Sequence, residues 1–311
     1  MEALLTIGSK VLVMLILILV GYIVSKKGMF SQQTAGELTT LLLRIVLPCL
    51  IVSAFIEFGS SVSFSEMGLS AALTGASMGI SLAASRFFFR KDIEKRTKVL
   101  QFSALFGNMG FMGVPLVQAI VGEQGVIYAS FAIVVFNLFS WTYGYRLMNS
   151  NAKMNIKTIL FNPGMIGILI GLPICLFKIQ IPSVVVDPIN FLASVNTPLA
   201  MIVIGSYVAK LEMKSFVSDM AVYRASALRL ILMPILTLGL LLLIRPKEDL
   251  FMVVLIQAAM PVAANTVLFA AQYKKDVELA TKIVAVSTLL SILTIPIFVI
   301  LGKWLLVLFG S

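Results

Sequence analysis

The chain has 311 residues, of which 59% are hydrophobic and 12% are charged, and its formal net charge is +10. Soluble domains are about 45–50% apolar and about 25% charged, so this composition excludes an ordinary soluble domain and indicates an integral membrane protein. The chain has no histidine, and its two cysteines, Cys49 and Cys175, lie far apart in apolar runs. It therefore lacks the commonest general base and metal ligand, and its cysteines show neither a disulfide framework nor a metal-ligand spacing.

The predicted fold is all α-helical, because about ten apolar runs have the length of roughly 20 residues that crosses a bilayer. The first run, Leu4–Val24, follows no basic residue and precedes no small-residue cleavage site, so we expect a retained helix rather than a signal peptide. The last run is longer than a bilayer requires, which predicts a tilted helix or an interfacial tail. The predicted spans are 4–24, 38–58, 68–89, 99–121, 126–148, 159–177, 188–208, 222–244, 251–273 and 279–309.

The basic residues gather on one side of these spans. Seventeen of the 24 lysines and arginines fall in the loops after the first, third, fifth, seventh and ninth spans or at the span ends that border these loops. Five lie on the opposite side, termini included, and two, Arg44 and Arg229, lie within spans. The positive-inside rule puts the 17-residue side in the cytoplasm and both termini outside the cell membrane. Membrane orientation therefore explains the positive charge better than nucleic-acid binding does.

Two predicted spans are interrupted by residues that break helices. The fourth contains Gly107-Asn-Met-Gly-Phe-Met-Gly-Val-Pro115, and the ninth contains Ala258-Ala-Met-Pro-Val-Ala-Ala-Asn-Thr266. Inside a helix, glycine costs about 1 kcal/mol and proline about 3 kcal/mol relative to alanine. Backbone groups freed within a membrane must line a cavity or be buried in protein. Two such interruptions, one in each half of the chain, are typical of the substrate site of a secondary transporter.

The halves of the chain also show an internal repeat, although few residues are identical. A shift of 150 positions places Gly21 on Gly171, and a shift of 151 lays the interrupted fourth span over the ninth. We predict a first five-helix repeat over residues 1–149 and a second over residues 150–311. Because five is odd, the second repeat enters the membrane from the opposite side, as in the inverted repeats of many secondary carriers.

This topology predicts how the interrupted spans are arranged. The first half of the fourth span ends near Phe106 and its second half begins at Pro115, which suits the first helical position because it needs no N–H. The second half of the ninth span begins near Thr266. Both second halves then point their N-termini, which favour anions, at the membrane centre, while the first halves point their negative C-termini at the same region.

The candidate substrate site takes residues from both interruptions. Asn108 and Asn265 carry amides that can donate to a carboxylate, or that can merely cap the broken helix ends. The predicted substrate-binding residues are Asn108, Gly113, Pro115, Pro261, Asn265 and Thr266.

Weaker interruptions occur in the second and seventh spans. Pro48 lies in the second, and Asn196, Thr197 and Pro198 lie together in the seventh. These residues either form simple kinks or serve as walls of the site, and the sequence leaves both interpretations open.

Arg44, Arg229, Asn137 and Gln257 are further polar residues inside predicted spans. Arg44 and Arg229 either attract the substrate or extend about two helical turns to the cytoplasmic surface, as long basic side chains can. For Asn137 and Gln257 we expect hydrogen bonds between helices.

The two interrupted segments resemble the crossover helices of the auxin efflux carrier family. The resemblance rests on Asn108-Met-Gly-Phe-Met-Gly-Val-Pro115 and on Pro261-Val-Ala-Ala-Asn265, and the ten-span layout extends it over nearly the whole chain. It implies two inverted repeats, with a scaffold of helices 1, 2, 6 and 7, often dimeric, and a transport domain of helices 3–5 and 8–10 that moves like an elevator. It also implies substrate binding at the crossing, with Asn108 as a carboxylate ligand.

The resemblance also bears on the substrate, because the family includes plant auxin exporters and bacterial carriers of malate, malonate and similar acids. The chain lacks the long hydrophilic loop of the plant exporters, since residues Asn149–Lys157 make only a short link. Asn265 falls where the plant pattern is typically apolar. A small organic acid of the bacterial type is therefore expected rather than auxin.

The sequence thus favours a secondary active or facilitated carrier of small organic anions, with the lipid bilayer and a second copy of the chain as partners. No cofactor is expected beyond a coupling Na⁺ or H⁺, and backbone carbonyls at the breaks can hold sodium. A cation–proton antiporter normally needs an acid inside a span, whereas all 14 acids fall in loops, termini or span ends. The interpretation as a membrane enzyme is disfavoured, because the chain lacks residues for acid–base or metal catalysis. The interpretation as a non-transporting sensor is left open by the sequence.

Overall fold

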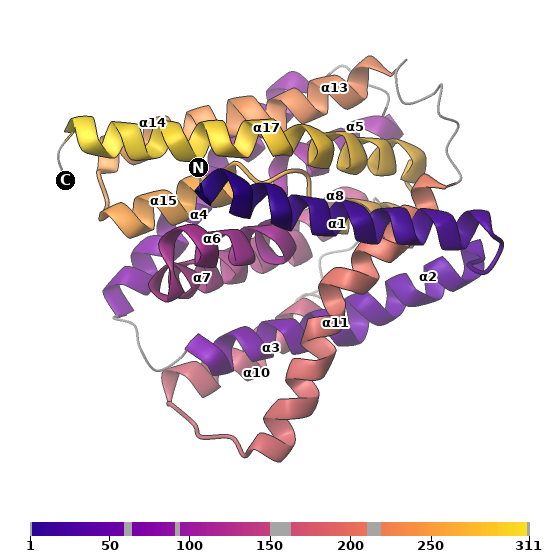
Figure 1. Cartoon of the computed structure of the whole chain (residues 1–311), viewed down its shortest axis with the longest axis horizontal. Helices are drawn as coiled ribbons and strands as arrows, with labels where there is room; N and C mark the ends of the chain where they lie inside the picture. Colours follow the sequence, from indigo (N-terminus) through magenta and orange to yellow (C-terminus); the bar gives the residue numbers. More distant parts are fainter. Residues whose placement is uncertain (1, 59–63, 91–93, 150–162, 210–218, 310–311) are drawn as a thin grey trace.

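The computed structural model describes residues 2–58, 64–90, 94–149, 163–209 and 219–309, and these ranges are helical apart from short connections (Figure 1). The helices are α1 (Glu2–Lys26), α2 (Gln32–Leu41), η1 (Leu42–Val46), α3 (Leu47–Phe58), α4 (Phe64–Phe88), α5 (Glu94–Leu105), η2 (Met109–Gly113), α6 (Val114–Val121), α7 (Glu123–Phe139), η3 (Ser140–Gly144), α8 (Tyr145–Met148), α10 (Pro163–Leu176), α11 (Ser183–Val208), α13 (Met220–Ala227), η4 (Leu228–Leu232), α14 (Met233–Ile244), α15 (Glu248–Ala258), α16 (Asn265–Gln272) and α17 (Val277–Phe309). The η elements are π-helical turns, each continuous with the helix that follows it.

Several of these helices have the length and composition of membrane spans. In the described part of the chain, four of them are long and apolar enough to cross a bilayer: Gln33–Glu57, Ser65–Phe88, Ser183–Val203 and Met220–Ile244. A fifth arises if the two parts of α17 count as one span. Together with the composition of the chain, these helices identify a multi-pass membrane protein.

The long last helix is bent rather than simply tilted. Its two parts, Val277–Ser291 and Leu293–Leu308, meet at an angle of 50°. Pro296 lies within the helix and cannot donate to the carbonyl of Ile292, four residues earlier, where the bend occurs. The over-long last span is thus a kinked helix, while its tilt or interfacial position stays a prediction.

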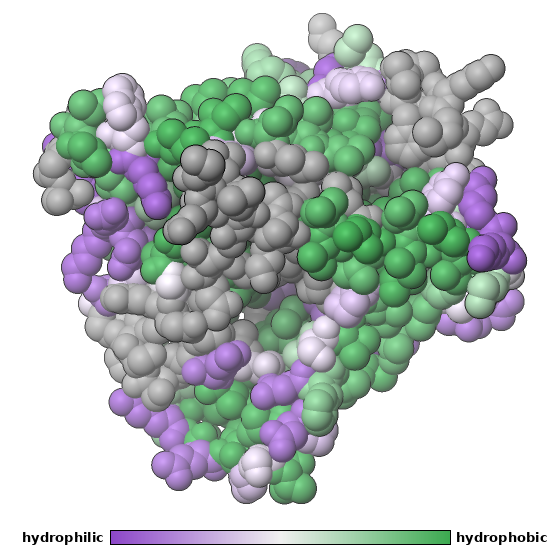
Figure 2. All heavy atoms as spheres, viewed as in Figure 1, coloured by the Kyte–Doolittle hydropathy of each residue, from purple (hydrophilic) through white to green (hydrophobic). Residues whose placement is uncertain are grey.

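The outer surface carries large apolar side chains of the kind that lipid covers. Phe177, Val184, Phe191, Leu243 and Val307 are each at least 73% exposed. Figure 2 shows apolar residues spread widely over one face of the molecule. Monomeric soluble proteins rarely expose apolar patches of this extent, so the surface agrees with the composition in indicating a membrane protein.

One group of helices packs through close glycine contacts. In this group α1 packs against α11 and crosses it at a large angle in the view of Figure 1, and α3 packs against both α10 and α11. A Cβ atom at Gly21 of α1 would lie 2.7 Å from the carbonyl carbon of Ile202, and one at Gly205 of α11 would lie 2.8 Å from the amide nitrogen of Tyr22. Small residues let helix backbones approach this closely in membranes.

A second group contains the interrupted segments and the most deeply buried core. Within it α4 and α6 pack on α7, and α15 and α16 pack on α17. Four aromatic rings cluster around α16: Phe102, Phe106, Trp141 and Phe269, with neighbouring ring centroids 4.3 to 5.2 Å apart. The two groups meet where α3 contacts α7, α2 contacts α16, and α1 contacts α6 and α17.

Candidate functional site

The two interrupted segments lie against each other and pair through their backbones. The N–H of Asn108 donates to the carbonyl of Pro261 at 2.7 Å, and the N–H of Ala263 donates to the carbonyl of Phe106 at 2.9 Å. The result is an isolated antiparallel bridge between Gly107 and Val262. Each break therefore supplies hydrogen-bond partners that the other would otherwise lack inside the membrane. The prediction that the two breaks meet is confirmed.

The second half of the fourth segment begins earlier than the sequence predicts. Its helix starts at Met109 with the π-helical turn η2, so the expected start at Pro115 is wrong. The carbonyl of Asn108 accepts from Gly113 at 3.0 Å, and Val114 donates to the carbonyl of Met109. Because both donors precede Pro115, this turn does not need the N–H that proline lacks. In the ninth segment α16 begins at Asn265, one residue before the predicted Thr266.

The asparagine side chains do not cap these helix ends. Asn108 is the N-cap of η2 and Ala264 is the N-cap of α16, and neither helix has a side-chain cap hydrogen bond. Asn108 is 5% exposed and Asn265 is 4% exposed, so both amides are withdrawn from solvent. Backbone groups at the two breaks hydrogen-bond to each other, and neither asparagine side chain caps a helix end. The alternative role of Asn108 and Asn265 as helix caps is therefore wrong.

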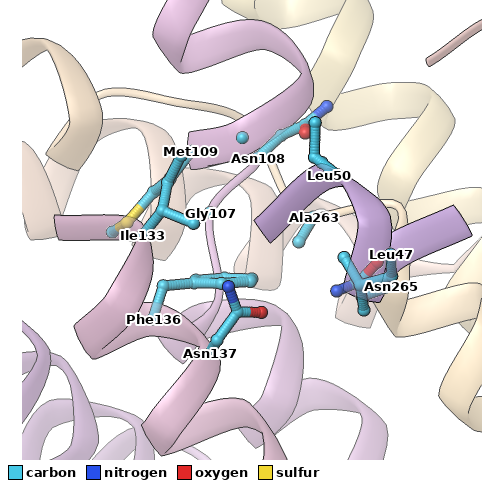
Figure 3. A pocket seen from close by; sticks show the side chains of 11 residues that line it. Leu47, Leu50, Gly107, Asn108, Met109, Ile133, Phe136, Asn137, Ala263 and Asn265 are labelled. Carbon is cyan, nitrogen blue, oxygen red and sulfur yellow. The ribbon is translucent and has the colours of Figure 1, made fainter. Parts of the chain in front are cut away.

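A small cavity lies between the crossing and helix α3, and Figure 3 shows the residues around it. The space open to the centre of a water molecule is about 20 Å³, which holds about one water molecule. The cavity is lined by Leu47, Leu50, Gly107, Asn108, Met109, Gly110, Ile133, Phe136, Asn137, Ala263 and Asn265.

Three side-chain amides reach this cavity from three different elements. Asn108 comes from the break before η2, Asn265 from the start of α16, and Asn137 from α7. Asn137 is 1% exposed, and its Oδ1 atom has no hydrogen-bond partner. Buried polar atoms are normally paired, so an orphaned amide oxygen at a cavity marks a position for a hydrogen-bond donor such as a water molecule.

The prediction of interhelical hydrogen bonds therefore succeeds for one residue and fails for the other. Gln257 Nε2 donates from α15 to the carbonyl of Ala129 on α7 at 3.4 Å. Asn137 instead faces the cavity. Asn137 is recognisable in the sequence as a polar residue in the middle of a span. The sequence alone does not distinguish a side chain that faces a cavity from one that faces a neighbouring helix.

Arg229 lies behind the crossing and does not extend to the surface. The side chain is 2% exposed. Its Nε atom donates to the carbonyl of Met260 at 3.0 Å, and its Nη2 atom donates to the carbonyl of Gln257 at 3.3 Å. The guanidinium also lies against Gly107. The cytoplasmic extension considered for Arg229 is thus wrong, whereas Arg44 is exposed and contributes nothing to the cavity wall.

The helix ends of opposite charge have different neighbours: the starts of η2 and α16 line the cavity, whereas the end of α15 contacts Arg229. The cavity is lined by the first residues of η2 and α16 and by no residue of α5 or α15. Helix N-termini carry about half a positive charge and C-termini about half a negative charge. Arg229 binds the C-terminal carbonyls of α15, so its charge offsets that negative end and leaves the positive ends facing the cavity.

The remaining predicted residues of the two breaks lie beside the cavity rather than on its wall. Gly113 is buried against the side chains of Met260 and Gln257. Pro261 and Thr266 are also buried, and Thr266 Oγ1 has no hydrogen-bond partner. The side chain of Pro115 lies outside the described residues.

Residues of the weaker interruptions are only partly connected with the site. Pro48 does not line the cavity, but it stands beside Leu47, which does. In α11, Asn196 is 2% exposed with its Nδ2 atom unpaired, and Pro198 lies within the helix. Neither lines the cavity, and the side chain of Thr197 lies outside the described residues. The wall residues from α3 and α7 were not predicted, because their apolar side chains resemble those that face lipid.

In the described part of the chain the acidic residues form no buried cluster and no candidate metal site. No aspartate or glutamate is buried there, and no group of three or more His, Cys, Asp or Glu side chains is placed to bind a metal ion. The polar groups at the cavity are therefore neutral amides and backbone groups, with one buried arginine behind them.

A helical membrane fold with two paired, interrupted helices beside a mostly apolar cavity that three asparagines line is the arrangement expected of a membrane transport protein. The chain belongs to the membrane transport protein family, which includes the auxin efflux carriers, and the family model matches residues 6–299. Its members are transporters, which confirms the expectation that the chain is not an enzyme.

Individual relatives support the same assignment over nearly the whole chain. An uncharacterized transporter of Methanocaldococcus jannaschii is 28% identical over 299 residues, which cover 93% of this chain and 96% of the relative. A Rhizobium meliloti protein named "Putative malonate transporter" is 23% identical over 295 residues, covering 90% of each chain. The uncharacterized transporter YfdV of Escherichia coli is 21% identical over 305 residues, covering 93% of this chain and 95% of the relative.

Proposed function

We propose that this protein is a secondary active or facilitated transporter of small organic anions, mono- or dicarboxylates, which bind at the crossing of the two interrupted helices. The observation that carries the proposal is the cavity between the crossing and α3. Asn108, Asn137 and Asn265 line it together with the starts of η2 and α16. Amide N–H donors and helix N-termini both favour a carboxylate.

Charge selection follows from the same arrangement. A buried anion is prohibitively costly unless hydrogen bonds and opposite charge compensate it. The cavity offers neutral donors and two helix N-termini, with Arg229 on the other side of Gly107. An organic cation finds no carboxylate there, since no acid is buried in the described part of the chain. This disfavours the alternative of a cation antiporter.

The proposed architecture is ten spans in two inverted repeats, and the packing supports it. Gly21 of α1 approaches α11, while Gly171 of α10, its counterpart in the repeat, approaches Phe55 of α3. In the order of spans these contacts join the first to the seventh and the sixth to the second. An inverted repeat exchanges these two pairs, and it maps the bridge between the fourth and ninth segments onto itself.

The same packing suggests which parts move. We assign α1, α2, α3, α10 and α11 to a scaffold and the remaining helices to a transport domain that carries the crossing. The cavity lies between the two groups, with Leu47 and Leu50 on the scaffold side. Its present space of about 20 Å³ is too small for a dicarboxylate, so substrate entry requires the groups to separate. An elevator-like displacement of the transport domain meets this requirement.

The name of one relative suggests a first substrate to test. One relative over nearly the full length carries malonate in its name, and the three amides can serve both carboxylates of a short diacid. We therefore take malonate as the first probe. We further propose a homodimer in the cell membrane with both termini outside, on the basis of the basic loops and the family layout.

The test is uptake of radiolabelled malonate, malate and a monocarboxylate into proteoliposomes containing the purified protein. We expect uptake of at least one acid, competition by unlabelled carboxylates, and no competition by the corresponding methyl ester or by an amine of similar size. Liposomes without protein give the background. Effective competition by the amine, with none by any carboxylate, would overturn the assignment to anions.

A further inference from the structure

The buried guanidinium of Arg229 is compensated by backbone carbonyls. It is 2% exposed. Among the residues that the structure describes, no salt bridge reaches Arg229. A charge inside a membrane span is costly and normally has a function. Its hydrogen-bond acceptors are the carbonyls of Gln257 and Met260, at the C-terminal end of α15.

These carbonyls belong to the set of groups that can hold a coupling ion. In transporters with broken helices, the C-terminal ends of half-helices and unwound carbonyls coordinate Na⁺. The break of the ninth segment offers such an end, but Arg229 Nε and Nη2 already bind it. The guanidinium also lies against Gly107, two residues after the end of α5. One fixed cation thus stands at the negative ends of both first half-helices.

Gly107 leaves space beside the crossing for the side chain of Arg229, which comes from a third segment of the chain. A Cβ atom at position 107 would lie 2.6 Å from Arg229 Cζ, so only glycine leaves room for the guanidinium. Arg229 itself lies in the π-helical turn η4 (Leu228–Leu232). π-Helical turns within α-helices often occur at functional sites, and this one precedes Pro234, which cannot donate a helical hydrogen bond.

We propose that Arg229 is a built-in cation that takes the place of a coupling sodium ion at the crossing, so that the anion is transported without sodium. The inference rests on the proposed function for its consequence in transport. Its claim about the cation site concerns the protein alone and can be tested without a substrate.

The first experiment measures thermal unfolding of the unaltered protein in detergent. Tm is recorded in NaCl, KCl and choline chloride at equal ionic strength, because a cation that binds only the folded state raises Tm with its concentration. We expect the three salts to give the same Tm within about 1 °C. A saturating rise that is specific to sodium would overturn the proposal, whether or not any acid is transported.

The second experiment asks whether the charge of Arg229 is what matters. Arg229→Ala removes the guanidinium and leaves its space empty, so we expect a lower Tm that millimolar guanidinium chloride raises and choline chloride does not. The unaltered protein serves as the control, because its site is already filled. An equal response of Arg229→Ala to both salts would show a general effect of ionic strength, with no cation site at this position, and would contradict the proposal. If this variant does not fold, the salt series on the unaltered protein decides.

The third experiment uses proteoliposomes and malonate, or whichever acid the uptake screen identifies. Uptake with sodium on both sides, or with sodium replaced throughout by choline, should agree within about twofold. Strict dependence on sodium would refute the built-in cation while leaving the proposed anion transport intact. If no acid is taken up in either salt, the proposed function fails, and the unfolding experiments still decide the cation site.

Discussion

Gly107 and Arg229 are fitted to each other across the crossing: the guanidinium of Arg229 occupies the space where a side chain at position 107 would be. A Cβ atom at Gly107 would lie 2.6 Å from Arg229 Cζ and would overlap Nη2. The guanidinium is held there by the carbonyls of Gln257 and Met260. These contacts join the break after α5, the π-helical turn η4 and the C-terminal end of α15.

We predict that Gly107→Ala destabilises the protein strongly. Overpacking costs about 1–3 kcal/mol, and displacing the guanidinium from its carbonyl partners adds to that cost. Gly110→Ala is the matched control, because a Cβ atom there meets nothing within 4 Å. Thermal unfolding should show a clear fall of Tm for the first variant and little change for the second.

The same pair can be tested by a double-mutant cycle. In an Arg229→Ala background the clash partner is gone, so adding Gly107→Ala should cost less than it does in the unaltered chain. Contacting residues typically show interaction energies of 0.5–3 kcal/mol, and we expect a value toward the upper end. Strict additivity would mean that the two residues do not share this space.

We predict that Asn108→Ala, Asn137→Ala and Asn265→Ala each weaken binding of the transported acid while leaving the fold largely intact. Losing a hydrogen bond to a charged group costs about 1.5–3 kcal/mol, which is about ten- to over a hundredfold in affinity. The half-saturation concentration for uptake should rise accordingly. Asn190→Ala is the control, because Asn190 is exposed, pairs with Ser53, and lies outside the cavity. Unchanged affinity in all three cavity variants would show that the three amides do not bind the substrate.

The interrupted segments were predictable from sequence because their cost is local. Glycine and proline in an apolar run weaken a helix whatever surrounds it, so the positions of both breaks and their meeting follow from residue type and repeat symmetry. The start of the second half-helix at Met109 does not follow. It depends on a π-helical turn whose hydrogen bonds avoid Pro115, and residue types alone do not specify such a turn.

The roles of Arg229 and Asn137 could not be predicted, because they depend on tertiary placement. A long basic side chain in a span can reach the surface or turn inward, and the space left by Gly107 on another helix decides between these outcomes. Asn137 faces the cavity only because of how α7 is rotated against the crossing. Likewise, the sequence does not show whether Leu47 and Leu50 line a cavity or contact lipid, because leucine is common in both places.

We predict that Gly205→Ala separates α1 from α11. A Cβ atom at this position would lie 2.8 Å from the amide nitrogen of Tyr22 and 2.9 Å from the carbonyl carbon of Ile18. Both are backbone atoms that cannot move alone, so overpacking of about 1–3 kcal/mol is expected. Gly239→Ala in α14 is the control, because nothing lies within 4 Å of its Cβ position. A fall of Tm only for Gly205→Ala would establish the contact, and equal Tm values would contradict it.

We predict that both chain termini lie outside the cell. After replacement of Cys49 and Cys175 by serine, single cysteines placed at Glu2 and Ser311 should react with an impermeant maleimide on intact cells, and one placed at Lys95 should react only after lysis. The reason is the excess of basic residues in the loops on one side of the spans. Cytoplasmic labelling of either terminus would contradict the inverted five-helix repeat.

The most discriminating prediction concerns Asn137→Asp. The substitution keeps the shape of the side chain but places a carboxylate at the cavity, 1% exposed at this position in the unaltered protein. At alkaline pH, where the new carboxyl group is ionised, its charge should repel an anionic substrate, so uptake should fall further than in Asn137→Ala. As the pH is lowered the new carboxyl group takes up a proton and the repulsion disappears, so the ratio of variant to unaltered uptake should rise. Taking the ratio at each pH removes the effect of the protonation of the substrate itself. If Asn137→Asp transports the acid as well as the unaltered protein at every pH, the cavity does not hold the carboxylate and the binding site must be placed elsewhere.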